Sequence, residues 1–200
     1  MGSIIGQIES VYLGVAGESL VKQPRSSLQA ELDGFVHDRH GSFERESWGV
    51  GDKQPAGVIR RNERQWSAVS LEELAGITRE MNLTEPVSAA SIGANLCISG
   101  VPNLSQLPKG SIFKFPSAAE LMVEEYNPPC KGVSKKIASL HKTISGEPLK
   151  ENAFSEAAKF SRGLVGVIEV AGEINEGDQF EVLIYEPPRW LSKIYRNSSQ

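Results

Sequence analysis

The sequence predicts a mainly β fold, either a β-barrel or a β-rich α+β domain, with a few short helices. About seven or eight segments have the composition of strands, and about three have the composition of short helices. Strands and helices do not alternate regularly, which argues against a doubly wound sheet. The 19 glycines and 11 prolines are spread along the chain, as expected for many short elements joined by turns.

The size and charge of the chain limit what it can be. Its 200 residues and 21.8 kDa predict one domain over residues 1–186 and a polar C-terminal tail over 187–200. A chain of this length buries roughly 70% of its unfolded surface, so its core needs neither a disulfide nor a metal. No apolar stretch approaches about 18 residues, so we expect no membrane partner. The net charge of −4 argues against a general polyanion binder, and no nucleic-acid partner is expected.

The N-terminal part predicts strands separated by polar loops. Residues 4–13 are rich in strand-forming residues and predict the first strand, whereas 14–31 predict a loop with one short strand. Residues 32–40 form a short apolar segment that ends in ionisable groups. Residues 41–63 contain Gly, Pro and charges without periodicity and predict a long loop, which in proteins is usually functional or disordered.

A strand followed by a capped helix is predicted next. Residues 64–69 have strand character, and Ser70 is a candidate N-cap with Glu73 as its reciprocal partner in a capping box. An apolar stripe follows at helical spacing and predicts a helix that ends near Asn82.

The remaining elements are short. Residues 119–126 fit a strand better than a helix because a Pro pair follows. We expect the last two strands to be joined by the polar Gly turn at 176–178. The predicted strands are 91–98, 111–115, 119–126, 163–172 and 180–186, and the predicted helices are 131–141 and about 153–160.

The N-terminus and the cysteines predict a cytoplasmic protein with free thiols. No basic region precedes an apolar run, so no secretory signal is expected. Gly2 suggests myristoylation only weakly, because Gly6 stands where that motif needs Ser or Thr. A non-secreted chain favours free thiols at its two cysteines, Cys97 and Cys130.

Cys130 is the strongest candidate for chemistry. Pro128 and Pro129 make the chain before it rigid, and the helix predicted from Lys131 places its sulfur near a helix N-terminus, which favours a thiolate. Lys135 and its lysine neighbours add positive charge. Such a thiolate is suited to act as a nucleophile, a persulfide carrier or a soft-metal ligand, and the alternative is a small apolar residue at a turn.

The other candidate residues carry weaker signals. Cys97 lies between apolar residues and fits an inert core thiol better than a reactive one. His37 and His40 have a zinc-like spacing, but His141 is the only other histidine and the ligand set is incomplete. His40 also fits proton transfer at a loop-built site, or a surface turn.

Arginines and one asparagine suggest an anion or heterocycle site. Arg60, Arg61 and Arg64 cluster before a strand, and guanidinium groups suit phosphate and carboxylate, although a solvated face is the default. Asn95 follows a Gly turn and could hydrogen-bond a heterocycle or a phosphate. No dinucleotide, Walker, nucleophile-elbow or HExxH motif is present, so ordinary nucleotide-fold and hydrolase functions lose their usual support.

Taken in order, these segments resemble the MOSC domain, found at the C-terminus of molybdenum cofactor sulfurases and as stand-alone bacterial proteins. The resemblance spans roughly residues 30–185 and depends on the order and spacing of its motifs. The segments that carry it are LDGFVHDRH, RQWSAVSLEEL, IGANLCISG with LPKG, NPPC and RGLVGVIEVAGEINEGDQFEV.

The resemblance implies a closed barrel like that of pyruvate kinase, and molybdenum cofactor (molybdopterin) chemistry. It implies that Cys130 carries sulfur or ligates molybdenum, and that His40 belongs to the catalytic site. Arg64 and Asn95 fall on matching positions and would bind the cofactor, with Arg162 as a further cation for its phosphate. Lys135 is also predicted to be a cofactor-binding residue. No pyridoxal phosphate domain is present in this chain, so no such chemistry is predicted.

Three differences from the family pattern accompany the resemblance. His37-Asp38 stands where the family often has Gly-Asp, Ala94 replaces a commoner Glu, and the 41–63 loop is longer than expected.

The leading hypothesis is a molybdenum cofactor protein that acts in sulfur transfer or in reduction of N-hydroxylated compounds, with a sulfur donor or an electron-transfer protein as partner. The alternatives are a cofactor-free persulfide carrier or adaptor, and a non-catalytic barrel that binds a small anion or a protein.

Overall fold

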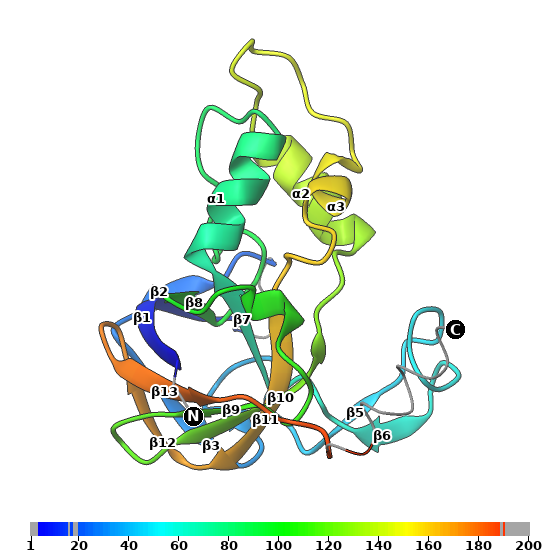
Figure 1. Cartoon of the computed structure of the whole chain (residues 1–200). Coiled ribbons are helices and arrows are strands. Elements are labelled where there is room, and N and C mark those ends of the chain that lie inside the picture. Colours follow the sequence, from blue (N-terminus) through cyan, green and yellow to red (C-terminus); the bar gives the residue numbers. More distant parts are fainter. Residues whose placement is uncertain (1–3, 16, 18–19, 189, 191–200) are drawn as a thin grey trace.

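A closed β-barrel with a layer of helices at one end forms the molecule, as the computed structural model shows for residues 4–15, 17, 20–188 and 190 (Figure 1). Seven strands form the barrel in the order β13-β9-β10-β11-β7-β8-β1, and pairing of β1 with β13 closes it. These strands are β1 (Ile4–Leu13), β7 (Trp66–Ser70), β8 (Leu96–Ser99), β9 (Ile112–Lys114), β10 (Glu120–Tyr126), β11 (Leu164–Val170) and β13 (Gln179–Leu183). The predicted mainly β fold is therefore confirmed.

Shorter strands surround the barrel. β2 (Gln23–Arg25) pairs with β1, and a separate sheet has the order β12-β3-β4. A two-stranded hairpin, β5 with β6, projects from the side of the barrel (Figure 1). The strands of the separate sheet are β3 (Ser27–Glu31), β4 (Gly34–Phe35) and β12 (Gly172–Asn175), and those of the hairpin are β5 (Glu44–Glu46) and β6 (Ile59–Arg61).

Aromatic side chains fill the barrel. The ring centroid of Phe113 lies 5.7 Å from that of Trp66 and 5.1 Å from that of Phe180, at tilted angles that suit aromatic contacts. The indole N–H of Trp66 donates to the carbonyl of Val167 at 2.9 Å, so the buried polar atom of this ring is satisfied. Because Trp66 packs against Gly166 of β11, a side chain at position 166 would clash with it.

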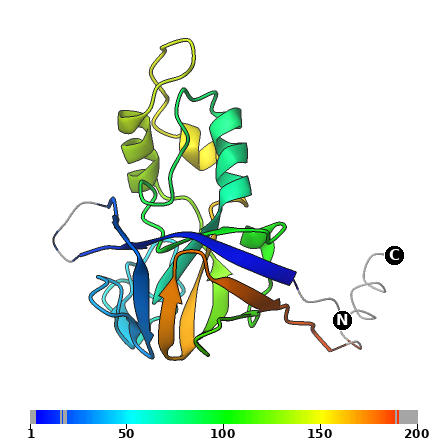
Figure 2. The same cartoon turned by 90° about the vertical axis from the view of Figure 1, so that its left-hand side faces the viewer.

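The helices form a second core on one end of the barrel (Figure 2). α1 (Leu71–Glu80) connects β7 to β8, and these two strands form the one parallel pair among the described strands. α2 (Lys131–Leu140) and α3 (Ala153–Ala157) pack beside α1 through buried apolar side chains. Those side chains include Leu74, Ile77, Val133, Ile137 and Phe154.

The cap of α1 is as predicted, but its reciprocal partner is different. The hydroxyl of Ser70 accepts the backbone N–H of Glu73 at 3.2 Å. The carboxylate of Glu73 instead accepts hydrogen bonds from the hydroxyl and the backbone N–H of Ser105, at 2.6 and 3.1 Å. The capping box expected from local sequence is therefore only half formed, because a residue 32 positions away offers Glu73 two donors.

Four predicted segments need correction. Residues 14–31 contain two short strands, β2 and β3, where one was predicted. The 41–63 segment is not wholly a loop, because it contains the β5–β6 hairpin. The 91–98 strand begins only at Leu96, since residues 89–94 form turns that close onto Ala89 and Ala90. The last two long strands are not joined directly, because β12 lies between them and pairs with β3. The predicted tail over 187–200 lies almost entirely outside the described residues.

Candidate functional site: a thiol in an arginine-lined cleft

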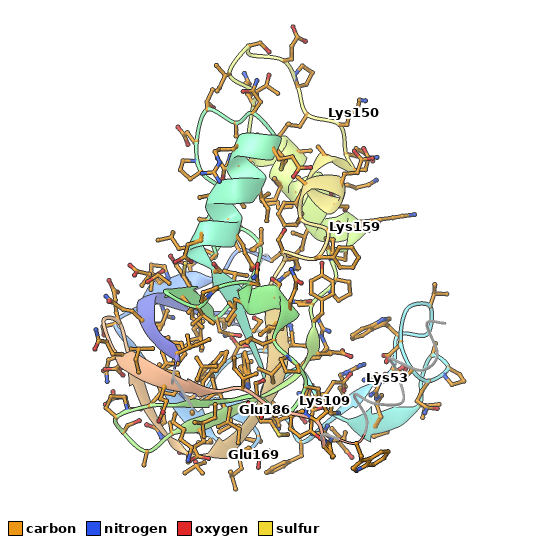
Figure 3. All side chains as sticks on the ribbon, in the orientation of Figure 1. Lys53, Lys109, Lys150, Lys159, Glu169 and Glu186 are labelled. Atoms are coloured by element: carbon orange, nitrogen blue, oxygen red, sulfur yellow. The ribbon has the colours of Figure 1, made fainter. Side chains whose placement is uncertain are left out.

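A cleft of about 960 Å³ lies between the β5–β6 hairpin, the end of β10 and the start of α2. Figure 3 shows Lys53 on the hairpin and Lys159 extending from the helical layer on the same side of the molecule. The cleft is large enough for a cofactor-sized ligand. Among the residues that line it are His40, Arg45, Trp48, Arg64, Cys130 and Arg162.

Cys130 is exposed at the cleft, and it is the N-cap of α2. Its backbone is extended (φ −106°, ψ 158°), and its sulfur accepts the N–H of Val133 at 3.5 Å. The prolines before it also line the cleft. The predicted placement of this thiol at a helix N-terminus is therefore confirmed. The sulfur thus accepts one of the N–H groups that the first turn of a helix leaves without an intrahelical partner.

Two arginines predicted to bind an anion lie in the same cleft. Arg64 donates to Asn127 at 2.5 Å and to Glu125 at 3.2 Å, and burial lowers the pKa of its guanidinium. Arg162 is 6% exposed, and its Nη2 donates to the carbonyl of Ile92 at 2.8 Å. Its Nη1 is buried without a hydrogen-bond partner among the described residues. A buried guanidinium with an unused donor is the kind of group that an anionic ligand satisfies.

The charge environment of Arg162 connects it to the thiol. Burial and the nearby Arg64 guanidinium lower the pKa of Arg162 to about 10, whereas the negative charge of a Cys130 thiolate opposes that shift. The two side chains are therefore close enough to interact electrostatically. A negative ligand beside Cys130 would lie within the field of this cation.

His40 is held by a buried carboxylate. Its Nδ1 lies 3.0 Å from Oδ1 of Asp38, and its backbone N–H donates to the same oxygen at 3.0 Å. The His40 side chain is half exposed, whereas the Asp38 side chain is fully buried. With Nδ1–H donating to Asp38, Nε2 is the nitrogen left to accept a proton at the cleft.

Asp38 is the centre of a buried network. Its Oδ2 accepts the Lys22 ammonium at 2.8 Å, the Asn95 amide at 2.8 Å and the Gly14 N–H at 2.9 Å. Burial raises the pKa of Asp38, but the His40 hydrogen bond and the Lys22 charge outweigh it and hold the pKa well below its usual range. Burial lowers the pKa of Lys22 to about 8, against the opposing effect of Asp38.

Asn95 lies behind the cleft and does not line it. Its amide donates to Asp38 and to the carbonyl of Tyr12, and its oxygen accepts the N–H and the hydroxyl of Ser67 at 3.1 Å each. The side chain is therefore fully hydrogen-bonded within the protein. Asn95 is connected to the cleft through Asp38, which also holds His40.

Lys135 is also away from the cleft. Its ammonium lies 3.1 Å from Glu151, in a shallow separate pocket on the outer side of α2. The structure thus brings together Cys130, His40, Arg64 and Arg162, and it separates Asn95 and Lys135 from them.

The structure also reveals site residues that sequence patterns did not single out. Trp48 and Arg45 come from the β5–β6 hairpin, and the Arg45 guanidinium carbon lies 4.0 Å from the Trp48 ring centroid. The unusual length of the 41–63 segment was the available signal for them. Asp38 lies between the histidines already considered, whereas nothing in the polar segment around Lys22 marks that residue.

The donor set of the cleft fits a ligand that carries both a soft metal and an anionic group. The described residues hold no cluster of three His, Cys, Asp or Glu side chains, so the three histidines do not assemble into a zinc site. A metal that brings its own dithiolate needs only one protein thiolate, which Cys130 offers. The unused Arg162 donor fits a phosphate.

Together, the fold and the cleft define a class of barrel protein with an exposed thiol beside one buried and one partly buried guanidinium group. The sequence matches the MOSC domain family over residues 38–181, and the chain belongs to that family. It is 31% identical over 181 residues to a Bacillus subtilis (strain 168) protein named "Putative metal-sulfur cluster biosynthesis proteins YuaD". The match covers 89% of this chain and 90% of that protein.

Solved structures agree with this assignment. The crystal structure of YuaD from Bacillus subtilis has a TM-score of 0.85 at 29% identity and covers 92% of this chain and 99% of that one. YiiM from Geobacillus stearothermophilus has a TM-score of 0.58 at 15% identity, covering 89% of this chain and 75% of its own. At that identity the likeness to YiiM shows the fold alone. In the described residues, no helix has the length and apolar character needed to cross a membrane.

Proposed function

We propose that the protein binds the molybdenum cofactor in this cleft, with Cys130 as the sulfur carrier or as the protein ligand of the metal. The observation that carries the proposal is the convergence of one exposed thiol with a buried, partly unpaired guanidinium in a cofactor-sized cleft. The family and the chemistry of the donor set support it.

Each residue of the cleft has a distinct role in this proposal. Arg64 and Arg162 hold the phosphate of the cofactor, since guanidinium groups bind phosphate through charge-assisted hydrogen bonds. His40, oriented by Asp38, accepts or donates a proton at Nε2. When bound, the cofactor supplies a dithiolene-held molybdenum that can exchange a sulfur or oxygen ligand and take up electrons. The partner is accordingly a sulfur donor or an electron-transfer protein.

Metal and pterin analysis tests this proposal. Protein produced in a host that makes the cofactor should contain molybdenum and fluorescent pterin, and Cys130→Ala should lose at least about tenfold in bound molybdenum. Arg79→Gln, an exposed change on α1, serves as the control and should retain both. Absence of molybdenum and pterin from the wild type, or equal contents in Cys130→Ala, would contradict the proposal.

A second candidate function is a cofactor-free persulfide carrier. It is favoured by the exposure of Cys130 and by the metal-sulfur cluster wording in the name of the Bacillus subtilis relative. The Cys130 thiolate would attack the outer sulfur of a donor persulfide, and the donor thiolate would leave with the electron pair of the broken S–S bond.

Incubation with a persulfide-loaded cysteine desulfurase tests the second candidate. Mass spectrometry should find one added sulfur atom on the peptide that contains Cys130 and none on the Cys97 peptide. If the same donor loads a known acceptor but leaves this protein unchanged, the carrier function is wrong.

A further inference from the structure

A small inner cavity lies behind the cleft and carries mainly positive side chains. Its volume is about 130 Å³, roughly that of four water molecules, so a pterin does not fit in it. Lys22, Arg39, Arg64 and Arg162 line it, and no carboxylate does so among the described residues. Arg64, Arg162 and His40 also line the outer cleft, so the cavity adjoins the cleft that Cys130 lines.

Arg162 distinguishes this cavity from an ordinary basic surface. Lys22 forms an ion pair with Asp38 and Arg64 forms one with Glu125, whereas Arg162 donates to the neutral carbonyl of Ile92. Its Nη1 is buried and unpaired within the described part of the chain. A buried guanidinium with an unpaired donor is unfavourable, so the site gains stability when a compact anion enters and accepts from that donor.

We propose that the inner cavity binds a small dianionic sulfane-sulfur donor of the thiosulfate type and that Cys130 removes its outer sulfur. The inference rests on the second candidate function, in which Cys130 carries sulfur without a bound cofactor. A persulfide on a donor protein is too large to enter the inner cavity and contact Arg162, whereas a small oxyanion can enter it. The sulfonate oxygens then lie on Arg162, and the outer sulfur points towards the thiolate.

The transfer step balances without any further reactant. The Cys130 thiolate attacks the outer sulfur of thiosulfate, and a new S–S bond forms at Cys130. The original S–S bond breaks, and its electron pair leaves on sulfite. Cys130 is oxidised to the persulfide level, and the departing sulfonate sulfur is reduced to sulfite. Arg162 faces the oxygens on which negative charge grows, and this favours the departure of sulfite.

Sulfite release and sulfur gain measured together test the inference. Wild-type protein incubated with thiosulfate at fixed ionic strength should release one sulfite per added sulfur on Cys130, and cyanide should recover that sulfur as thiocyanate. Cys130→Ala should release none.

Arg162 is tested by a ratio of two loading rates. In Arg162→Gln, loading from thiosulfate should fall at least about tenfold relative to loading from a persulfide-loaded desulfurase, because a charge-assisted hydrogen bond is lost. Arg79→Gln, which makes the same change at an exposed site on α1, should keep the wild-type ratio.

A competition measurement on the wild type keeps the test valid if Arg162→Gln does not fold. Sulfate, which has no transferable sulfur, should raise the half-saturating thiosulfate concentration without changing the maximal rate, whereas chloride at the same ionic strength should not. Loading by the desulfurase without loading by thiosulfate would overturn this inference alone. Loading by neither donor would overturn the carrier function as well.

Discussion

At the scale of single residues, the buried carboxylate of Asp38 links the fold to the cleft. It accepts hydrogen bonds from Lys22, Asn95 and His40, so one side chain neutralises a buried cation and also orients the imidazole at the cleft. Asn95 is thus connected to the cleft through Asp38, although it does not line the cleft.

Asp38→Asn should lower the free energy of unfolding by about 3 kcal/mol, because it leaves the Lys22 ammonium buried without a counter-charge. Urea denaturation monitored by circular dichroism measures this change. Glu173→Gln on the exposed face of β12 is the control and should change stability by less than about 0.5 kcal/mol. Equal stability of Asp38→Asn and the wild type would contradict the buried network.

The stabilisation that the ionised Asp38 carboxylate contributes should decrease as the pH falls. Because the folded-state pKa of Asp38 is depressed, its stabilisation is fully present above the unfolded value of about 3.9 and is lost as the pH falls towards the folded value. The difference in free energy of unfolding between the wild type and Asp38→Asn should therefore narrow from about pH 5 to about pH 3. A difference that stays constant or widens over this interval would show that another group controls the acid response.

At the scale of elements, close packing of β11 against β10 and β7 keeps the barrel narrow. A Cβ at Gly166 would clash with the carbonyl of Met122 and the indole of Trp66. Gly166→Ala should therefore destabilise the protein by about 3 kcal/mol. Gly76→Ala on α1 meets nothing within 4 Å and should stabilise the protein by about 0.5–1 kcal/mol. Thermal unfolding of both variants checks the pair, and similar shifts of the same sign would contradict this packing.

The β5–β6 hairpin places Trp48 in the cleft, where its fluorescence can report ligand binding. The guanidinium carbons of Arg45 and Arg64 lie 4.0 and 5.6 Å from the centroid of the Trp48 ring. An anion that binds the cleft arginines should change these cation–π contacts and therefore the emission of Trp48. Trp48→Phe should remove at least about half of the fluorescence change on sulfate addition, whereas Trp190→Phe should keep it. The reverse pattern would place the anion away from the hairpin.

At the scale of the whole molecule, sequence patterns predicted individual barrel strands better than they predicted barrel closure and the small sheet that contains β12. Strand β1 runs over 4–13 as predicted, because its composition and its tertiary environment favour the same conformation. Closure of the barrel through Ile4 and Val182 could not be predicted from local patterns, because it joins residues at opposite ends of the chain. The same limit explains why β12 was missed, since its partner is the distant β3.

For the candidate site, too, features with a local sequence signal were predictable, and features that depend on contacts between distant residues were not. Cys130 was predictable because the Pro-Pro elbow and the helix start are both local signals. The burial of Asn95 and the outward position of Lys135 depend on packing that no local pattern encodes. Pairing of Lys22 with Asp38, 16 residues apart, likewise appears only in the folded chain.

The contrast between the two cysteines tests the central claim most directly. Cys130 is exposed at the cleft, whereas Cys97 is 5% exposed in the second core, where burial raises the pKa of its thiol to about 11. Iodoacetamide at neutral pH, followed by peptide mapping over time, should label Cys130 at least about 100-fold faster than Cys97. If Cys130 instead reacts as slowly as Cys97, and only when the protein unfolds, its sulfur is not open to a ligand and the proposed chemistry is wrong.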